Sequence, residues 1–146
     1  MAATNHHRIL VVDDQQVIRR GLRSFLEPNP KWEVCGEASN GREATEAARR
    51  ARPDVIIMDV TMPEMDGIAA TREIKKFLPG ARILILSMHD SAQLVDSALR
   101  AGASGYMLKD DLGRQLFVAL ETVLLGDRYL SPRLQKKEPD GASAGR

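Results

Sequence analysis

The sequence predicts an α/β fold, a three-layer sandwich in which a five-stranded parallel sheet of order 2-1-3-4-5 is covered by five helices. Compact apolar runs alternate along the chain with segments whose apolar residues recur at helical spacing. Strands that are apolar throughout are typical of parallel sheets, because right-handed crossovers place helices on both faces. Four of the runs also end in polar residues, at the edge where open α/β sheets bind their ligands.

The first half of the chain supplies two expected strands and two helices. Residues 9–12 form the first strand, and Pro28 and Pro30 end the helix after it. Apolar residues of that helix recur at helical spacing: Ile18, Leu22, Phe25 and Leu26. Residues 32–38 form the second strand. The next helix carries a stripe of small residues that allows close packing on the sheet: Ala44, Ala47, Ala48 and Ala51.

The second half continues the alternation with three strands and three helices. The third strand, residues 55–58, leads into Asp59, and Asp66 is the expected N-cap of the next helix. A fourth strand, residues 83–86, precedes a helix that Gly102 is expected to cap. The fifth strand is followed by the last helix, which Gly126 is expected to close. The apolar residues that mark this helix are Leu112, Leu116, Ala119, Leu120 and Val123.

Length and pattern predict one folded domain with two polar ends. A chain of 146 residues with 43% hydrophobic residues can bury one ordinary core. Residues 1–7 are predicted to form an N-terminal arm, residues 8–130 the domain, and residues 131–146 a linker or tail. The last segment lacks an apolar stripe and ends in small residues typical of linkers.

Composition argues against a membrane protein and against a nucleic-acid-binding surface over the whole chain. Charged residues make up 28%, and no apolar run reaches membrane-spanning length. The 21 lysines and arginines are balanced by 20 aspartates and glutamates, so there is no basic excess for phosphate backbones. The single cysteine, Cys35, cannot form an internal disulfide, and the first residues lack the apolar core of a signal peptide. We therefore expect a cytoplasmic location.

Polar residues suited to a phosphoryl group follow four of the strands. Asp13 and Asp14 follow the first strand, Asp59 the third, Ser87 the fourth and Lys109 the fifth. In the order 2-1-3-4-5 the first and third strands are neighbours, so the three carboxylates are expected to meet. Crowded carboxylates repel one another and need a cation, and Mg²⁺ prefers oxygen ligands of this kind.

These residues have separate expected roles in phosphoryl transfer. Asp59 is the expected nucleophile, because this reaction depends mainly on positioning and on neutralising oxygen charge. Lys109 supplies a mobile point charge for the phosphoryl oxygens, and Ser87 can donate a hydrogen bond to one of them. Taken singly, each residue also has a simpler explanation, such as a helix cap or an exposed lysine. Their shared position at the strand ends favours the site.

Four motifs resemble those of the receiver domains of bacterial two-component response regulators. They are the strand ending in Asp13-Asp14, residues 56–67, the strand ending in Ser87, and residues 102–109. The resemblance covers roughly residues 8–129. Residues 102–110 and 129–132 look like the NarL/FixJ subfamily, whose receivers precede a helix-turn-helix DNA-binding domain. No segment after residue 133 is expected to form that domain here.

The resemblance implies a flavodoxin-like fold and a phosphorylation site. The position of Asp59 would take a phosphoryl group from a histidine kinase or a phosphotransfer protein. Asp14, Asp59 and the backbone carbonyl of Thr61 would bind Mg²⁺ directly, or Mn²⁺ in its place, and Asp13 would act through a water molecule. Such a domain catalyses only its own phosphorylation and dephosphorylation, so we do not expect a conventional enzyme.

The resemblance also implies a conformational switch and an output. Ser87 and Tyr106 match the switch pair, in which the hydroxyl moves toward the phosphoryl group and the aromatic ring turns inward. A homodimer is expected on phosphorylation, with DNA contacted only through an effector domain outside this chain and no contact with a membrane. The alternative is a stand-alone receiver that acts as a phosphorelay intermediate or a protein-binding module.

Three other functions fit these residues less well. A phosphatase that forms an aspartyl phosphate carries a second aspartate two residues after the nucleophile, where this chain has Thr61. A flavin-binding module needs a loop of small residues after the first strand, where Asp13-Asp14 stands. A receiver-like module that is never phosphorylated usually lacks an acidic or lysine position, and all are present. One departure from the family pattern is Asp110, which stands where many receivers have a proline.

Overall fold

One parallel sheet runs through the molecule, and the computed structural model describes residues 6–135 of the chain. The sheet has six strands in the order β2-β1-β3-β4-β5-β6. The strands are β1 (His7–Val12), β2 (Trp32–Ala38), β3 (Val55–Asp59), β4 (Arg82–Ser87), β5 (Gly105–Leu108) and β6 (Tyr129–Leu130). The predicted order 2-1-3-4-5 is confirmed, and β6 is an additional strand beside β5.

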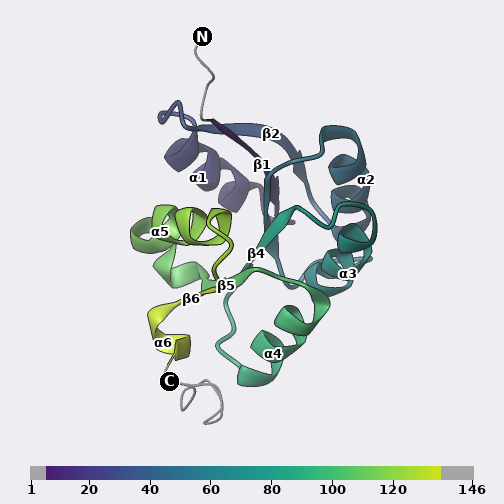
Figure 1. Cartoon of the computed structure of the whole chain (residues 1–146), viewed down its shortest axis with the longest axis vertical. Coiled ribbons are helices and arrows are strands. Elements are labelled where there is room, and N and C mark those ends of the chain that lie inside the picture. Colours follow the sequence, from purple (N-terminus) through teal and green to yellow (C-terminus); the bar gives the residue numbers. More distant parts are fainter. Residues whose placement is uncertain (1–5, 136–146) are drawn as a thin grey trace.

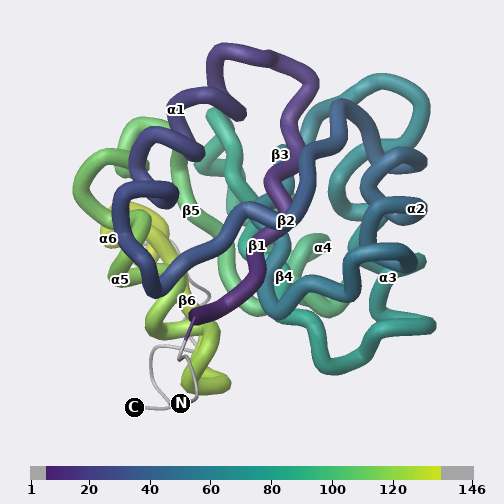
Figure 2. The backbone as a smooth tube through the Cα atoms, turned by 90° about the horizontal axis from the view of Figure 1, so that it is seen from above, coloured from purple at the N-terminus to yellow at the C-terminus, as the bar shows by residue number. Residues whose placement is uncertain are grey.

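Helices cover both faces of the sheet (Figure 1). They are α1 (Gln16–Leu26), α2 (Gly41–Ala51), α3 (Gly67–Phe77), α4 (Ala92–Ala101), α5 (Leu112–Leu124), α6 (Pro132–Gln135) and the short 3₁₀ helix η1 (Lys109–Asp111). Figure 2 shows α1 and α5 on one side of the strands and α2 and α3 on the other. The fold is therefore the predicted three-layer α/β sandwich. No helix within residues 6–135 is long and apolar enough to cross a membrane.

The strands are apolar on both sides because each side packs on a layer of helices. Ile9, Val11 and Ile57 belong to the core under α1 and α5. Leu10 and Ile56 belong to the core under α2, α3 and α4. All five side chains are fully buried. This two-sided burial explains why these runs show no alternation of apolar and polar residues.

Side-chain and glycine caps fix the ends of several helices. The Asp66 carboxylate accepts a hydrogen bond from the Ala69 N–H at 2.8 Å, so the predicted N-cap of α3 is confirmed. Asn40 caps α2 in the same way by accepting from the Glu43 N–H at 2.8 Å. Gly102 ends α4 with a φ of 112°, in the left-handed region that glycine adopts without strain, as predicted.

The described chain differs from expectation at both ends of the domain. Strand β1 begins at His7, two residues before the predicted strand and one residue before the predicted start of the domain, and His6 Nε2 lies 3.0 Å from the Glu33 carboxylate. At the other end β6 lies within the predicted domain as an unpredicted strand, and α6 forms after Ser131, where a linker or tail was expected. Both elements are too short for hydrophobic periodicity to indicate them. The rest of the predicted arm and tail lies outside the described residues.

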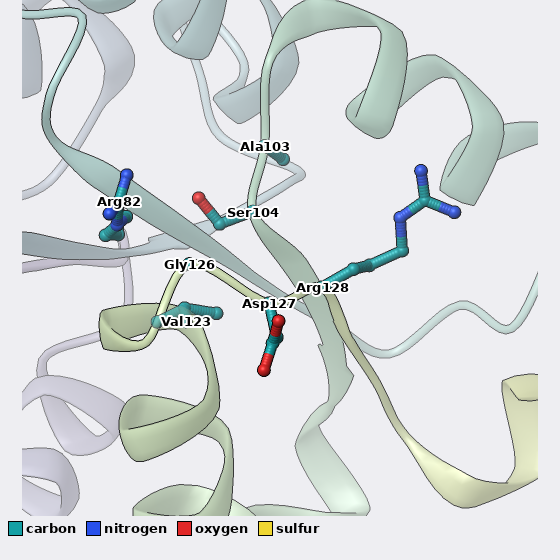
Figure 3. A pocket seen from close by; sticks show the side chains of 7 residues that line it. All are labelled: Arg82, Ala103, Ser104, Val123, Gly126, Asp127 and Arg128. Carbon is teal, nitrogen blue, oxygen red and sulfur yellow. The ribbon is translucent and has the colours of Figure 1, made fainter.

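A small pocket of ≈ 140 Å³ lies at the amino ends of β4, β5 and β6 (Figure 3). Its lining consists of Arg82, Ala103, Ser104, Val123, Gly126, Asp127 and Arg128. None of these residues was predicted to carry phosphoryl chemistry. The pocket is therefore separate from the site described below, which lies at the carboxyl ends of the strands.

Candidate functional site

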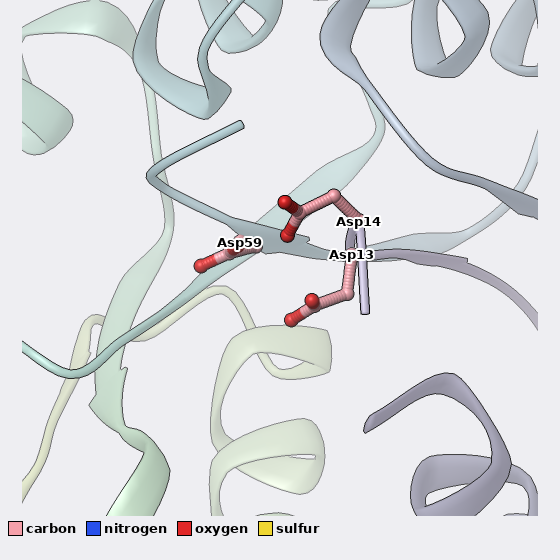
Figure 4. Close-up of side chains that lie close together, drawn as sticks. All are labelled: Asp13, Asp14 and Asp59. Atoms are coloured by element: carbon pink, nitrogen blue, oxygen red, sulfur yellow. The ribbon is translucent and has the colours of Figure 1, made fainter. Parts of the chain in front are cut away.

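The carboxyl ends of β1, β3 and β5 bring together the residues that the sequence singled out. Asp13 directly follows β1, Asp59 is the last residue of β3, and Lys109 directly follows β5. Asp13, Asp14 and Asp59 each offer a carboxylate oxygen, and these oxygens lie within 4.8 Å of one another (Figure 4). The adjacency of β1 and β3 in the sheet produces this cluster.

Lys109 joins the acidic cluster from the far side of β4. Its Nζ lies 3.2 Å from Oδ2 of Asp13 and 3.4 Å from Oδ1 of Asp59. The Asp13 side chain is fully buried, and only 11% of the Lys109 side chain is exposed. Water therefore screens these ion pairs less than it screens pairs on the surface. One ammonium group does not balance three carboxylates, so the cluster keeps an excess of negative charge.

One oxygen of Asp13 is buried without a hydrogen bond. Its Oδ1 accepts from the Gln15 N–H at 2.9 Å. Its Oδ2 has no hydrogen-bond partner among the described residues, because the Lys109 ammonium is at ion-pair distance but not in hydrogen-bond geometry. A buried acceptor of this kind is unfavourable unless a cation or water meets it. With the exposed Asp14 and with Asp59 it forms an all-oxygen donor set, which fits a hard divalent cation.

Burial raises the pKa of Asp59 from 3.8 to about 6. Loss of solvation is the largest cause, and the neighbouring negative charge of Asp13 raises the pKa further. The Lys109 ammonium and a backbone hydrogen bond from Thr61 act in the opposite direction. The Asp59 carboxylate is therefore mostly ionised at neutral pH, although its surroundings disfavour the charge.

Two glycines allow the loop after Asp59 to fold tightly against its neighbours. A Cβ atom on Gly67 would overlap the Asp59 carbonyl oxygen, and one on Gly41 would overlap the Met65 carbonyl oxygen. Backbone hydrogen bonds use the space that these glycines leave. The Gly67 N–H donates to the Val60 carbonyl at 3.0 Å, and the Gly41 N–H donates to the Met65 carbonyl at 2.8 Å. The loop between β3 and α3 is thus fixed near both ends, which holds Asp59 in place.

Ser87 and Tyr106 are connected through one residue, His89. Ser87 Oγ accepts from the His89 backbone N–H at 2.9 Å, and the Tyr106 hydroxyl donates to the His89 carbonyl at 2.9 Å. Both side chains are fully buried, so the Tyr106 ring lies inward, and this burial raises the pKa of its hydroxyl. The sequence singled out Ser87 and Tyr106 as a pair. It gave no sign of the link, because contacts to backbone atoms leave no residue signature.

Thr61 lies exposed at the rim of the cluster, two residues after Asp59. Its backbone hydrogen bond helps to lower the Asp59 pKa, but no contact of its carbonyl oxygen tests the predicted role as a metal ligand. The separate roles predicted for Asp13, Asp14, Ser87 and Lys109 also stay predictions. What the structure establishes is their common location.

The family profile described as the response regulator receiver domain matches residues 9–121, well over half of the chain. The chain belongs to this family. The flavodoxin-like receiver fold and the identification from four motifs are thereby confirmed. The matched region is a receiver domain of a response regulator and not a conventional enzyme domain.

Curated relatives of this receiver include transcriptional regulatory proteins. DegU of Brevibacillus brevis is 36% identical over 130 residues, which cover 89% of this receiver and 55% of DegU. LnrK of Bacillus subtilis is 38% identical over 127 residues, which cover 87% of this receiver and 58% of LnrK. The receiver thus spans a little more than half the length of these relatives.

Solved structures of similar sequence have the same fold. A two-component response regulator of the LuxR family from Aurantimonas sp. matches this receiver with a TM-score of 0.86 at 39% identity, covering 90% of this receiver and 94% of that chain. The signal receiver domain of NarL from Mycobacterium tuberculosis matches with a TM-score of 0.79 at 32% identity, covering 84% and 98%. The predicted relationship to NarL-type receivers is confirmed, and a LuxR-family regulator is also among the relatives.

Proposed function

We propose that this receiver is a phosphorylation-dependent switch of a two-component system. Asp59 accepts a phosphoryl group from the phosphohistidine of a histidine kinase or a phosphotransfer protein. The observation that carries the proposal is the contact of Lys109 with both Asp13 and Asp59, at the edge where three carboxylates meet. An acidic cluster suited to a cation, beside a buried ammonium group, suits a reaction that depends on positioning and charge neutralisation.

Asp59 supplies the nucleophile in this proposal. One carboxylate oxygen attacks phosphorus, the P–N bond of the donor breaks, and its electron pair returns to the imidazole, which takes up a proton. A pKa of about 6 leaves most of the Asp59 carboxylate ionised and ready to attack at neutral pH. The Lys109 ammonium, already held 3.4 Å from Asp59, neutralises charge on the phosphoryl oxygens.

Magnesium fits the oxygen donors of this site, and Mn²⁺ fits them as well. We assign Asp14, Asp59 and the Thr61 carbonyl as direct ligands and Asp13 as a ligand through water. When bound, the ion supplies positive charge that screens Asp59 from the incoming phosphoryl group. The buried, unbonded Oδ2 of Asp13 supports this assignment, because it is an acceptor without a protein donor.

Ser87 and Tyr106 are the proposed switch pair. Ser87 Oγ accepts from His89, so its own proton can be donated to a phosphoryl oxygen without loss of that bond. The Tyr106 hydroxyl is bonded to the same residue, so movement of the Ser87 loop toward Asp59 shifts the hydrogen-bond partner of Tyr106. A phosphoryl group therefore biases a two-state equilibrium of loop and ring. The inward ring seen here corresponds to the phosphorylated state in that scheme.

The proposed output is transcriptional control through a DNA-binding domain outside residues 1–146. DegU and LnrK are named transcriptional regulatory proteins, and the receiver spans 55% and 58% of their lengths. We therefore propose residues 8–130 as the receiver and residues 131–146, which begin with α6 docked on the domain, as the segment that leads toward a helix-turn-helix domain. The near balance of 21 basic and 20 acidic residues does not favour DNA contact by the receiver itself.

Phosphorylation is also proposed to promote a homodimer. Helix α5 and the residue after it expose apolar side chains that can form such a contact, with Val118 52% and Leu125 78% exposed. Beryllofluoride, which mimics a phosphoryl group on aspartate, is expected to raise the sedimentation coefficient of the receiver in the presence of Mg²⁺. An unchanged coefficient at saturating beryllofluoride would remove the dimer from the proposal and leave the acceptor chemistry standing.

Intact-mass analysis after incubation with acetyl phosphate tests the acceptor role. We expect one acid-labile phosphoryl group on the receiver with Mg²⁺, none with EDTA, and none on Asp59→Asn. Asp96→Asn is the matched control, because Asp96 is an exposed aspartate of α4 that pairs with Arg100, and it should be labelled like the unchanged chain. Absence of an adduct on the unchanged receiver, or a persistent adduct on Asp59→Asn, would contradict the proposal.

A further inference from the structure

The segment after α5 folds back along the switch residue Tyr106. We call residues 129–135, which form β6 and α6, the C-terminal strap. Strand β6 pairs in parallel with β5, and the Ser131 N–H donates to the Tyr106 carbonyl at 3.1 Å. Ser131 Oγ accepts from the Leu108 N–H at 2.9 Å in a buried position. The strap is therefore bonded to β5 at Tyr106 itself and again two residues further on.

The strap also contributes to the apolar layer that contains the Tyr106 ring. Leu130 and Leu134 are 6% and 2% exposed, and they belong to the same buried cluster as Tyr106. That cluster also includes Val95 and Ala98 of α4. A four-residue helix is not stable by itself, so burial of these two leucines is the main force that docks the strap.

An ion pair links the strap to the loop that holds the switch pair. Arg133 Nε lies 3.7 Å from Oδ2 of Asp90, and both side chains are about half exposed. Asp90 directly follows His89, which is hydrogen-bonded to Ser87 through its N–H and to Tyr106 through its carbonyl. A half-exposed pair stabilises only weakly. The ion pair nevertheless shows that the loop and the strap are in direct contact.

The side of the strap that faces away from α4 is open beside α6. A groove of ≈ 600 Å³ separates it from the beginning of α5, and its lining consists of Leu108, Asp110, Asp111, Arg114, Gln115, Pro132 and Arg133. The α6 part of the strap is thus packed against the layer of α4 and separated from the start of α5, whereas β6 is tied to α5 because the Tyr129 hydroxyl donates to Gln115 Oε1 at 2.6 Å. It can undock as a local unit without breaking the five predicted strands of the sheet.

We propose that the C-terminal strap is a latch coupled to the switch, docked while Tyr106 is inward and loosened when Tyr106 moves outward. The inference rests on the proposed function, because the phosphoryl group on Asp59 sets the position of Tyr106. Phosphorylation then tightens the strap and fixes the direction in which the following segment leaves the domain. Because such coupling is reciprocal, a weakened strap lowers the affinity of the site for a phosphoryl mimic.

Fluorine NMR of the full chain tests this coupling, because the chain contains two tyrosines, Tyr106 and Tyr129. With 3-fluorotyrosine, Mg²⁺ and beryllofluoride, a single spectrum follows three things. The signal of bound beryllofluoride reports occupancy of the Asp59 site. The Tyr106 signal reports the position of its ring, and the Tyr129 signal reports the docking of the strap. Tyr129→Phe assigns the two tyrosine signals. We expect both signals to shift together as the site fills.

Two variants of the strap and one control test the predicted change in affinity for beryllofluoride. Leu134→Ala removes the buried anchor and is expected to weaken beryllofluoride binding about tenfold. Arg133→Gln removes only the pair with Asp90, with an expected loss of about twofold. Arg133→Gln therefore still tests the coupling if Leu134→Ala lowers the stability of the whole domain. Arg100→Gln removes an exposed arginine that pairs with Asp96 on α4, and its affinity should not change.

The possible failures of this experiment are distinguishable. Bound beryllofluoride with a shifted Tyr106 signal, an unshifted Tyr129 signal and unchanged affinity in both strap variants would overturn the latch. The phosphoacceptor function would survive that result. Absence of a bound beryllofluoride signal from the unchanged chain with Mg²⁺ would overturn the proposed function, and the latch with it.

Discussion

Replacing Gly67 with alanine is expected to lower the free energy of unfolding by about 3 kcal/mol and to displace Asp59. The added methyl group would overlap the Asp59 carbonyl oxygen and lie 3.1 Å from Met58 Cγ. The first of these atoms is backbone, and Met58 is a fully buried core side chain, so neither can turn aside. The first turn of α3 must therefore move away from the sheet, and the end of β3 moves with it.

Urea unfolding would measure the loss of stability in Gly67→Ala, and acetyl phosphate labelling would measure the effect on the acceptor. Gly21→Ala is the matched control. No neighbouring atom lies within 4 Å of a Cβ built on Gly21, which stands inside α1. Alanine favours helix there, so this control should gain about 0.5–1 kcal/mol. Equal stability of the two variants would show that the close approach of α3 to Asp59 is not rigid.

Most of the architecture could be predicted because its signals are local and repeated. The apolar runs before Asp13 and Asp59 are long enough to be recognised as buried strands, and their order follows from the common topology of such folds. Asp66 and Gly102 could be assigned as caps because each has a specific physical role at a helix end. These features need only the neighbouring residues for their explanation.

The C-terminal strap could not be predicted, because its stability comes from distant parts of the chain. A two-residue strand and a four-residue helix carry no periodicity. Leu130 and Leu134 are held by a core built from five other strands and three helices. Ser131 reads as an ordinary loop residue until its hydroxyl is seen to accept the Leu108 N–H. The structure of such a segment is determined by its burial against distant parts of the chain rather than by a local sequence pattern.

The sequence also could not predict which of the two adjacent aspartates faces inward. Successive side chains of an extended segment point to opposite sides, so one of Asp13 and Asp14 had to face inward. The turn into α1 settles which: the Gln15 N–H donates to the Asp13 carboxylate, and Arg19 donates to the Asp13 carbonyl at 2.6 Å. Asp13 is therefore buried beside Lys109, and Asp14 is exposed.

Asp59→Asn is expected to stabilise the metal-free receiver at neutral pH by up to about 3 kcal/mol. Because folding raises the pKa of Asp59 from 3.8 to about 6, the folded state keeps this proton over a range in which the unfolded chain has lost it. The stability that this group contributes is therefore complete below about pH 4 and is lost as the pH rises to about 6. Asparagine carries no charge to bury, so it removes this loss.

Urea unfolding in EDTA at a series of pH values from 4 to 7 measures the effect. The stability of the unchanged receiver should fall relative to Asp59→Asn as the pH rises, and the gap should level off as the pH passes through about 6 toward 7. Subtracting the stability of one protein from that of the other cancels the contributions of the other carboxyl groups. Glu37, whose pKa is lowered by its hydrogen bond to Arg23, gives an opposite slope in both proteins. Parallel curves would contradict the explanation by a buried charge.

Adding Mg²⁺ should change the relative stability of the unchanged receiver and Asp59→Asn in the opposite direction. A cation among the carboxylates offsets the charge of Asp59, so Mg²⁺ is expected to restore stability to the unchanged receiver and to stabilise Asp59→Asn much less. If Mg²⁺ stabilised both equally, the ion would be held without Asp59, and the ligand assignment would fail. In the proposed function, the charge that would make Asp59 a nucleophile is thus the same charge that opposes folding, and a bound cation would make the two compatible.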